Sequence, residues 1–177
     1  MDTLNELFED QIKDLYSAES QLIKALPKMA KKAVTPELKK GLEKHLEQTQ
    51  GHLNRLSQIA EMWEFKPSGK KCKAMEGLID EGKEVLDQGG DDAVVDSALI
   101  AAAQRVEHYE ISAYGSARAI AERLGCSDSA SLLQKTLDEE SDADKLLTKV
   151  SETSTLKRAP IEESKDAERE DSEEDDD

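Results

Sequence analysis

Residues 101–110 read Ala-Ala-Ala-Gln-Arg-Val-Glu-His-Tyr-Glu, a run rich in helix formers with two glutamates three positions apart. In an α-helix, residues three and four positions apart lie on one face. Ala103 is therefore followed on its face by Glu107 and Glu110, and then by Tyr114. The stretch predicts a helix whose apolar, core-facing side is interrupted by two carboxylates one turn apart.

The same helical spacing of apolar residues recurs on both sides of this stretch. Thr3 and Glu6 form a capping box, and the Thr35 hydroxyl before Pro36 is an N-cap signal. Gly125 is expected as a C-cap. We expect four long helices over about residues 4–33, 36–63, 91–124 and 127–151, and a shorter helix over about 73–88.

The lengths of the links between these helices predict their connectivity. Short links join the first long helix to the second and the third to the fourth, which makes each pair antiparallel. The segment between the second and third long helices is long enough to travel the length of a bundle. The predicted fold is all-α, a ferritin-like four-helix bundle with a long crossover that carries the short extra helix.

Charge is distributed unevenly along the chain. Residues 161–177 hold 11 acidic and 2 basic residues, so they account for −9 of the net charge of −16. We expect residues 1–155 to form the ferritin-like bundle and residues 156–177 to form a disordered acidic tail, because the tail has almost nothing to bury. Neither part has the basic excess that nucleic-acid binding requires.

Three features favour a cytoplasmic protein. The longest apolar run, over residues 98–103, is far shorter than the about 20 residues that a membrane span requires. The only cysteines are Cys72 and Cys126, and no charged-then-apolar signal segment is present at the N-terminus. We therefore expect no membrane partner and a reducing compartment.

Acidic and imidazole side chains interrupt the apolar face of every long helix near its middle. Since antiparallel helices of similar length bring their midpoints level, these interruptions are expected to meet in one layer. The candidate metal ligands in this layer are Glu19, His52, Glu107, Glu110, Glu140 and Asp144.

Burying several carboxylates in one layer needs compensation. Uncompensated, it costs far more than the about 5–15 kcal/mol of stability that a domain has. Two divalent cations bridged by carboxylates would compensate it, and oxygen-rich ligation with an imidazole suits iron or manganese.

Other interpretations of these residues remain open. Each acid alone is more typical of a hydrogen-bonded core residue, and Arg105 or a buried histidine can pair with one of them without a metal. His45 and His108, taken separately, are more typical of packing or hydrogen-bonding histidines. The whole layer can also be a metal-free hydrogen-bond network.

Several stretches of the chain resemble the YciE/YciF family of ferritin-like bacterial stress proteins over about residues 3–152. The stretches are Leu15-Tyr-Ser-Ala-Glu-Ser-Gln-Leu22, His45-Leu-Glu-Gln-Thr-Gln-Gly-His52, Cys72-Lys-Ala-Met-Glu-Gly-Leu-Ile79, Ala101 to Glu110, and Thr136-Leu-Asp-Glu-Glu140 with Ala143-Asp144. The resemblance implies a ferritin-like fold, a homodimer and an association with stress responses.

The chain departs from the Glu-x-x-His pairs that ferritin-like di-iron proteins carry on two helices. The second long helix offers Glu47 with Gln50, or Thr49 with His52. The fourth long helix has Ala143 at the histidine position after Glu140. These departures leave the ligands on the second helix undecided.

Three functions are compatible with the sequence. The first is a dinuclear iron or manganese protein that acts on oxygen or peroxide. The second is a non-enzymatic, dimeric stress protein with a metal-free polar network. The third is iron storage, which requires a closed shell of subunits that nothing in the sequence predicts.

Overall fold

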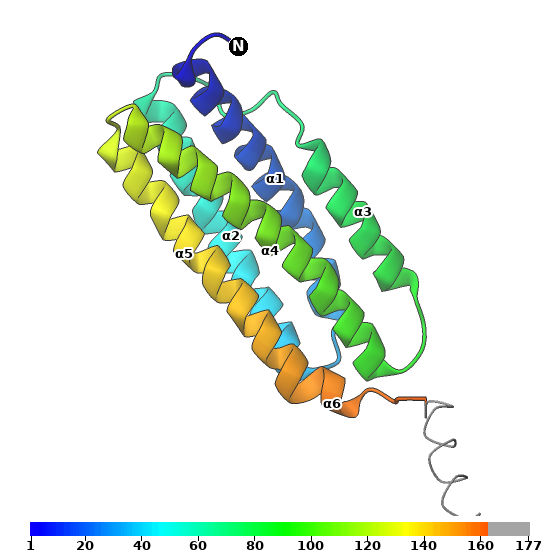
Figure 1. Cartoon of the computed structure of the whole chain (residues 1–177). Coiled ribbons are helices and arrows are strands. Elements are labelled where there is room, and N and C mark those ends of the chain that lie inside the picture. The colour runs from blue at the N-terminus through cyan, green and yellow to red at the C-terminus, as the bar shows by residue number, and fades with distance from the viewer. Residues whose placement is uncertain (163–177) are drawn as a thin grey trace, which may run out of the picture.

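The computed structural model describes residues 1–162, which form a bundle of helices without a β-strand (Figure 1). The elements are α1 (Leu4–Lys32), α2 (Pro36–Met62), α3 (Lys73–Asp87), α4 (Asp92–Arg123), α5 (Ser127–Val150), a π-helical turn (Ser151–Thr155) and α6 (Leu156–Arg158). All five predicted helices are present, and each ends within one or two residues of its predicted bounds.

The four long helices, α1, α2, α4 and α5, lie side by side (Figure 1). Helices α1 and α2 pack closely as one pair, and α4 and α5 as another. The short helix α3 lies within the link between α2 and α4 and packs along the outside of α1 and α4. The structure therefore confirms the predicted four-helix bundle with one long crossover and a short extra helix.

The start of α2 is stabilised differently from the prediction. Thr35 is the N-cap residue of α2 and Pro36 its first residue, as predicted, but the Thr35 side chain makes no capping bond to α2. Its hydroxyl oxygen instead accepts a hydrogen bond from Arg158 Nη2 at 2.5 Å. The backbone N–H of Thr35 donates to Asp96 Oδ2 at 2.6 Å, which ties the link between α1 and α2 to α4.

The helical body extends further than the predicted boundary at residue 155. Thr155 is buried and accepts a hydrogen bond from the Ser97 hydroxyl at 2.9 Å. Helix α6 then carries the chain to Arg158, whose bond to Thr35 holds this end against the bundle. Residues 163–177, most of the predicted acidic tail, lie outside the residues that the structure describes.

A polar layer divides the apolar core into two clusters. Leu15 belongs to the cluster at one end of the bundle, with Phe8 and Tyr114, and Leu22 belongs to the cluster at the other end. Glu19 lies between these two leucines on the same face of α1 and is fully buried. Within residues 1–162, no helix has the length and apolar character to cross a membrane.

Candidate metal centre

Six buried side chains from the four long helices converge in the polar layer. Glu19 comes from α1, His45 and His52 from α2, Glu107 and Glu110 from α4, and Glu140 from α5. Their potential ligand atoms form two groups, within each of which the atoms lie no more than 4.8 Å apart. Glu140 belongs to both groups, so the two share a carboxylate.

The two oxygens of Glu140 face different histidines. Oε1 lies 2.9 Å from Nδ1 of His52, and the same nitrogen lies 3.3 Å from Oε1 of Glu19. Oε2 lies 3.7 Å from Nε2 of His45, which in turn lies 3.4 Å from Oε1 of Glu107. A carboxylate placed in this way can bridge two cations, one on each side.

Helical spacing explains how α2 supplies two imidazoles. His45, Thr49 and His52 are all buried on the face of α2 that points into the bundle. The Thr49 hydroxyl donates to the His45 carbonyl oxygen at 2.8 Å, so its hydrogen-bonding need is met within the helix. His45 and His52, two turns apart with ring centroids separated by 6.2 Å, are therefore the α2 groups that face the centre.

Most polar side-chain atoms of this layer have no hydrogen-bond partner. Within residues 1–162, ten buried side-chain polar atoms lack a partner, and nine of them belong to the six converging residues. They include both oxygens of Glu110 and Glu140 and both ring nitrogens of His45. Each unsatisfied buried group costs about 1–3 kcal/mol, and more when it is charged. A bound cation would give these unpaired atoms a partner.

The carboxylates of the layer differ in their affinity for protons. Burial raises the pKa of Glu107 well above its usual range, and the charge of Glu140 adds to the effect. Burial does the same to the pKa of Glu110, with the charge of Glu19 next in importance. Burial would also raise the pKa of Glu140, but the two adjacent histidines outweigh it and lower that pKa.

The pKa values of the two histidines are shifted in opposite directions. Burial lowers the pKa of His45, which favours its neutral form. Burial would also lower the pKa of His52, but its close contacts with Glu140 and Glu19 raise that pKa to about 10. Without metal, His52 is therefore an imidazolium at neutral pH, and it balances part of the negative charge around it.

A chain of polar contacts orients the ring of His52. Nε2 of His52 lies 2.8 Å from Oε2 of Glu139, and Arg55 binds both oxygens of Glu139 at 2.8 Å. Arg55 also donates to the Thr136 hydroxyl at 3.0 Å. Burial would raise the pKa of Glu139, but Arg55 and His52 lower it, so it remains an anion. This arrangement holds the Nε2 proton and leaves Nδ1 for a metal.

Tyr114 makes the corresponding contact with Glu19. Its hydroxyl donates to Glu19 Oε1 at 2.5 Å, while Oε2 of Glu19 has no partner. Burial raises the pKa of Tyr114, so the phenol keeps its proton. One oxygen of Glu19 is thus held in place, and the other is free to bind a cation.

The donor set fits a dinuclear iron or manganese centre. Ferritin-like di-metal proteins use four glutamates and two histidines, and this layer contains the same numbers of each. Their distribution differs, since α2 supplies two histidines and α4 supplies two glutamates. Carboxylates with a minority of imidazoles are ligands that both metals accept.

Five of the six predicted ligands meet in this layer, and Asp144 does not. Asp144 is half-buried, accepts a hydrogen bond from Gln104 Nε2 at 2.9 Å and lies 3.3 Å from Nε2 of His108. One turn beyond Glu140, its side chain reaches toward α4 and leaves the layer. The prediction of Asp144 as a ligand is therefore not supported by its position.

His45 is the residue of the layer that the prediction missed. The sequence contains a signal for it, because positions 45 and 52 are seven residues apart and share a helix face. On α5, Ala143 occupies the position at which a ferritin-like protein would carry a histidine, and it lines the same pocket as His45. Helix α2 thus brings an imidazole to the side of the layer on which α5 carries alanine.

Residues 3–160 match the family described as "Domain of unknown function (DUF892)". Protein YciF of Escherichia coli (strain K12) is 42% identical over 160 residues, covering 90% of this chain and 96% of the relative. The solved structure of the E. coli stress protein YciF has a TM-score of 0.86 at 41% identity, covering 90% of this chain and 100% of that one.

Other solved structures share the fold. YcfI from Rhodopseudomonas palustris has a TM-score of 0.81 at 42% identity, covering 84% of this chain and 94% of that one. A ferritin-like, diiron-carboxylate protein from Bacillus anthracis has a TM-score of 0.66 at 15% identity, covering 85% of this chain and 99% of that one. The chain has the ferritin-like fold and belongs to the DUF892 family, which includes the YciF proteins.

Proposed function

We propose that this chain is a ferritin-like stress protein that binds two iron or manganese ions in the polar layer and acts on oxygen or peroxide. The role in stress rests on its similarity to the E. coli stress protein YciF. The proposal of a metal centre rests on this chain's own residues. We further propose that the protein is a homodimer, as the family resemblance implies, and that it is cytoplasmic.

One observation supports the metal centre above all others. Glu140 presents one oxygen to His52 and the other to His45, and neither oxygen makes a well-aligned hydrogen bond. A network of hydrogen bonds would satisfy at least one of them. Two cations flanking Glu140 would satisfy both oxygens and give the remaining unpaired atoms a partner as well.

Held by these residues, a pair of ferrous ions would supply the two electrons that, with two protons, the reduction of one hydrogen peroxide to two waters requires. The chain's own residues fix the geometry of the site. Glu139 holds the proton on Nε2 of His52, and Tyr114 holds one oxygen of Glu19. The two apolar clusters above and below the layer keep bulk water away from it.

A second candidate is a non-enzymatic, dimeric stress protein whose polar layer works without metal. The pKa of about 10 at His52 favours it, since an imidazolium between Glu19 and Glu140 compensates part of their charge. Protonation of Glu107 and Glu110, whose pKa values are raised, would remove much of the remaining charge.

Metal analysis separates the two candidates. The purified chain is incubated without oxygen with ferrous or manganous ions, desalted and analysed by elemental mass spectrometry. We expect two ions per chain, and at most one for Glu107→Ala. The exposed Glu122→Ala on the same helix is the control and should keep both ions. Fewer than one ion per wild-type chain with either metal would favour the metal-free network.

Mass in solution tests the assembly. A homodimer by light scattering is expected, and it would exclude the closed shell that iron storage requires. Iron storage would be supported only by a large assembly, and the donor set of the polar layer does not depend on one.

A further inference from the structure

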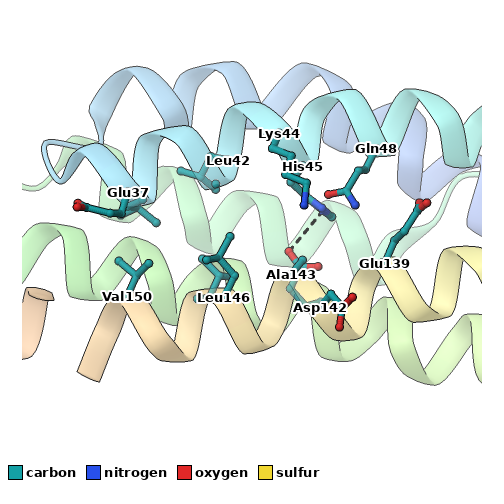
Figure 2. A pocket seen from close by; sticks show the side chains of 14 residues that line it. Glu37, Leu42, Lys44, His45, Gln48, Glu139, Asp142, Ala143, Leu146 and Val150 are labelled. Carbon is teal, nitrogen blue, oxygen red and sulfur yellow. Dashed lines mark ion pairs between the residues drawn. The ribbon is translucent and has the colours of Figure 1, made fainter. Parts of the chain in front are cut away.

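A narrow pocket leads to the polar layer between α2 and α5 (Figure 2). Its volume is about 30 Å³. The walls are largely apolar and include Leu42 from α2 with Ala143 and Leu146 from α5. His45 and Glu107 are also part of the lining, and Figure 2 shows His45 extending from α2 toward α5. Helices α2 and α5 pack less closely than the pairs α1–α2 and α4–α5, which leaves room for the pocket.

The candidate metal centre is least deeply buried on this side. His45 and Glu107 retain 5% and 3% exposure, whereas the other four converging residues are fully buried. Both ring nitrogens of His45 and one oxygen of Glu107 have no hydrogen-bond partner. The pocket thus ends on unpaired polar atoms of two candidate ligands.

The pocket's size and walls limit what can occupy it. One water-sized molecule needs about 10–15 Å³ of such space, so the pocket holds two or three non-hydrogen atoms. A charged species would lose its hydration against the leucine walls, which disfavours ions. The charged side chains of Glu37, Lys44 and Asp142 lie at the exposed rim and remain in solvent.

We propose that this pocket admits a small uncharged oxidant, dioxygen or hydrogen peroxide, to the His45 side of the centre and excludes bulky organic hydroperoxides. The proposal rests on the proposed function, because it supplies the access route and the size limit for that site. Gly41 and Leu146 set the size of molecule that the pocket can admit. A Cβ atom at residue 41 would lie 3.2 Å from Cδ2 of Leu146, so a side chain there narrows the pocket.

Xenon tests the pocket in the metal-free protein, because this gas occupies small apolar cavities. Crystals of the wild-type chain under xenon pressure should show a bound atom between Leu42 and Leu146. Gly41→Val should lose it. Gly115→Val on α4 is the matched control and should keep it, since a Cβ at residue 115 meets nothing within 4 Å. No xenon in the wild type, or xenon retained in Gly41→Val, would overturn the proposal.

Peroxide consumption by the iron-loaded protein tests the size limit. Gly41→Val should slow the consumption of hydrogen peroxide by about tenfold at unchanged iron content. Leu146→Ala should widen the pocket and speed the consumption of cumene hydroperoxide relative to hydrogen peroxide. Equal rates for the two peroxides in the wild type would overturn the size limit. If no iron binds, the proposed function fails, and the xenon result still decides whether the pocket exists.

Discussion

Nε2 of His52 lies 2.8 Å from Oε2 of Glu139, and this contact decides which ring nitrogen faces the polar layer. Glu139 is itself held by Arg55 through two bonds of 2.8 Å. Because Nε2 is occupied, Nδ1 is the nitrogen available to a metal. The orientation of this ligand is thus fixed from outside the polar layer.

We expect Glu139→Ala to weaken metal binding by about 10–100-fold, as is typical when a residue supporting a metal-bound histidine is lost. The measurement is calorimetric titration with manganous ions. Glu139→Gln should retain most of the affinity for metal, since its amide oxygen can still accept a hydrogen bond from Nε2 of His52. Asp138→Ala removes the same charge from the exposed side of α5 and is the control. Unchanged affinity in Glu139→Ala would show that the contact does not support a ligand.

Glu110→Leu should stabilise the metal-free protein. Glu110 is fully buried, and neither of its oxygens has a partner. Replacing an unsatisfied buried acid by an apolar residue is expected to raise the free energy of unfolding by about 1–3 kcal/mol. Urea unfolding without metal measures this gain, with Glu122→Leu as the exposed control on α4.

The same Glu110→Leu variant should lose most of the stabilisation that metal gives to the wild type. Thermal unfolding with and without manganous ions measures this difference. A variant that is less stable without metal and equally stabilised with it would indicate that Glu110 is satisfied inside the protein.

The two cysteines should react at different rates with iodoacetamide. Cys72 is 1% exposed, and burial followed by its contact with Asp14 raises the pKa of its thiol. Cys126 is only half-buried. Since the thiolate is the reacting form, we expect a single label on Cys126 before Cys72 reacts. Peptide mass spectrometry at successive times checks this, and the opposite order would contradict the packing around Cys72.

Asp14 should make the stability of the fold depend on pH. Burial would raise the pKa of Asp14, but hydrogen bonds from Cys72 and Tyr109 and the charge of Lys70 lower it. A carboxylate whose pKa is lower in the folded than in the unfolded state stabilises the fold above its unfolded pKa of about 3.9. That contribution is lost as the pH falls through the folded pKa.

Asp14→Asn should therefore be less stable than the wild type at pH 7, and the difference should shrink at about pH 3. Urea unfolding at both pH values measures it. Asp128→Asn, an exposed acid at the start of α5, is the control. A difference that is the same at both pH values would mean that the Asp14 charge is not stabilised by its neighbours.

The helices could be predicted because their causes are local. The capping threonine at residue 3 bonds to Glu6, and Gly125 ends α4 in a left-handed conformation with a φ of 76°. Thr35 shows where local reasoning fails. Its hydroxyl binds Arg158, 123 residues further along the chain, and no sequence pattern encodes that contact.

The candidate site also has residues that local patterns predict and residues that they do not. Glu19, Glu107, Glu110 and Glu140 could be predicted because each occupies a position on the apolar face of its own helix. His45 is harder to predict, since a single histidine on an apolar face is more typical of packing. Asp144 follows Glu140 by one turn, which predicts a ligand, but its side chain accepts a hydrogen bond from the amide of Gln104 on α4 and lies outside the layer. Whether the side chains of His45 and Asp144 reach the layer depends on how α2 and α4 are rotated against α5.

The most direct test of the metal centre is a crystal structure of the iron-loaded protein with anomalous diffraction at the iron edge. We predict two peaks about 3.5–4 Å apart. They should flank Glu140, one beside Glu19 and His52 and the other beside His45, Glu107 and Glu110. Two results would contradict the metal centre: an iron-loaded crystal with no peak in this layer, or one in which His52 still contacts only carboxylates. Either result would leave the metal-free hydrogen-bond network as the role of these residues.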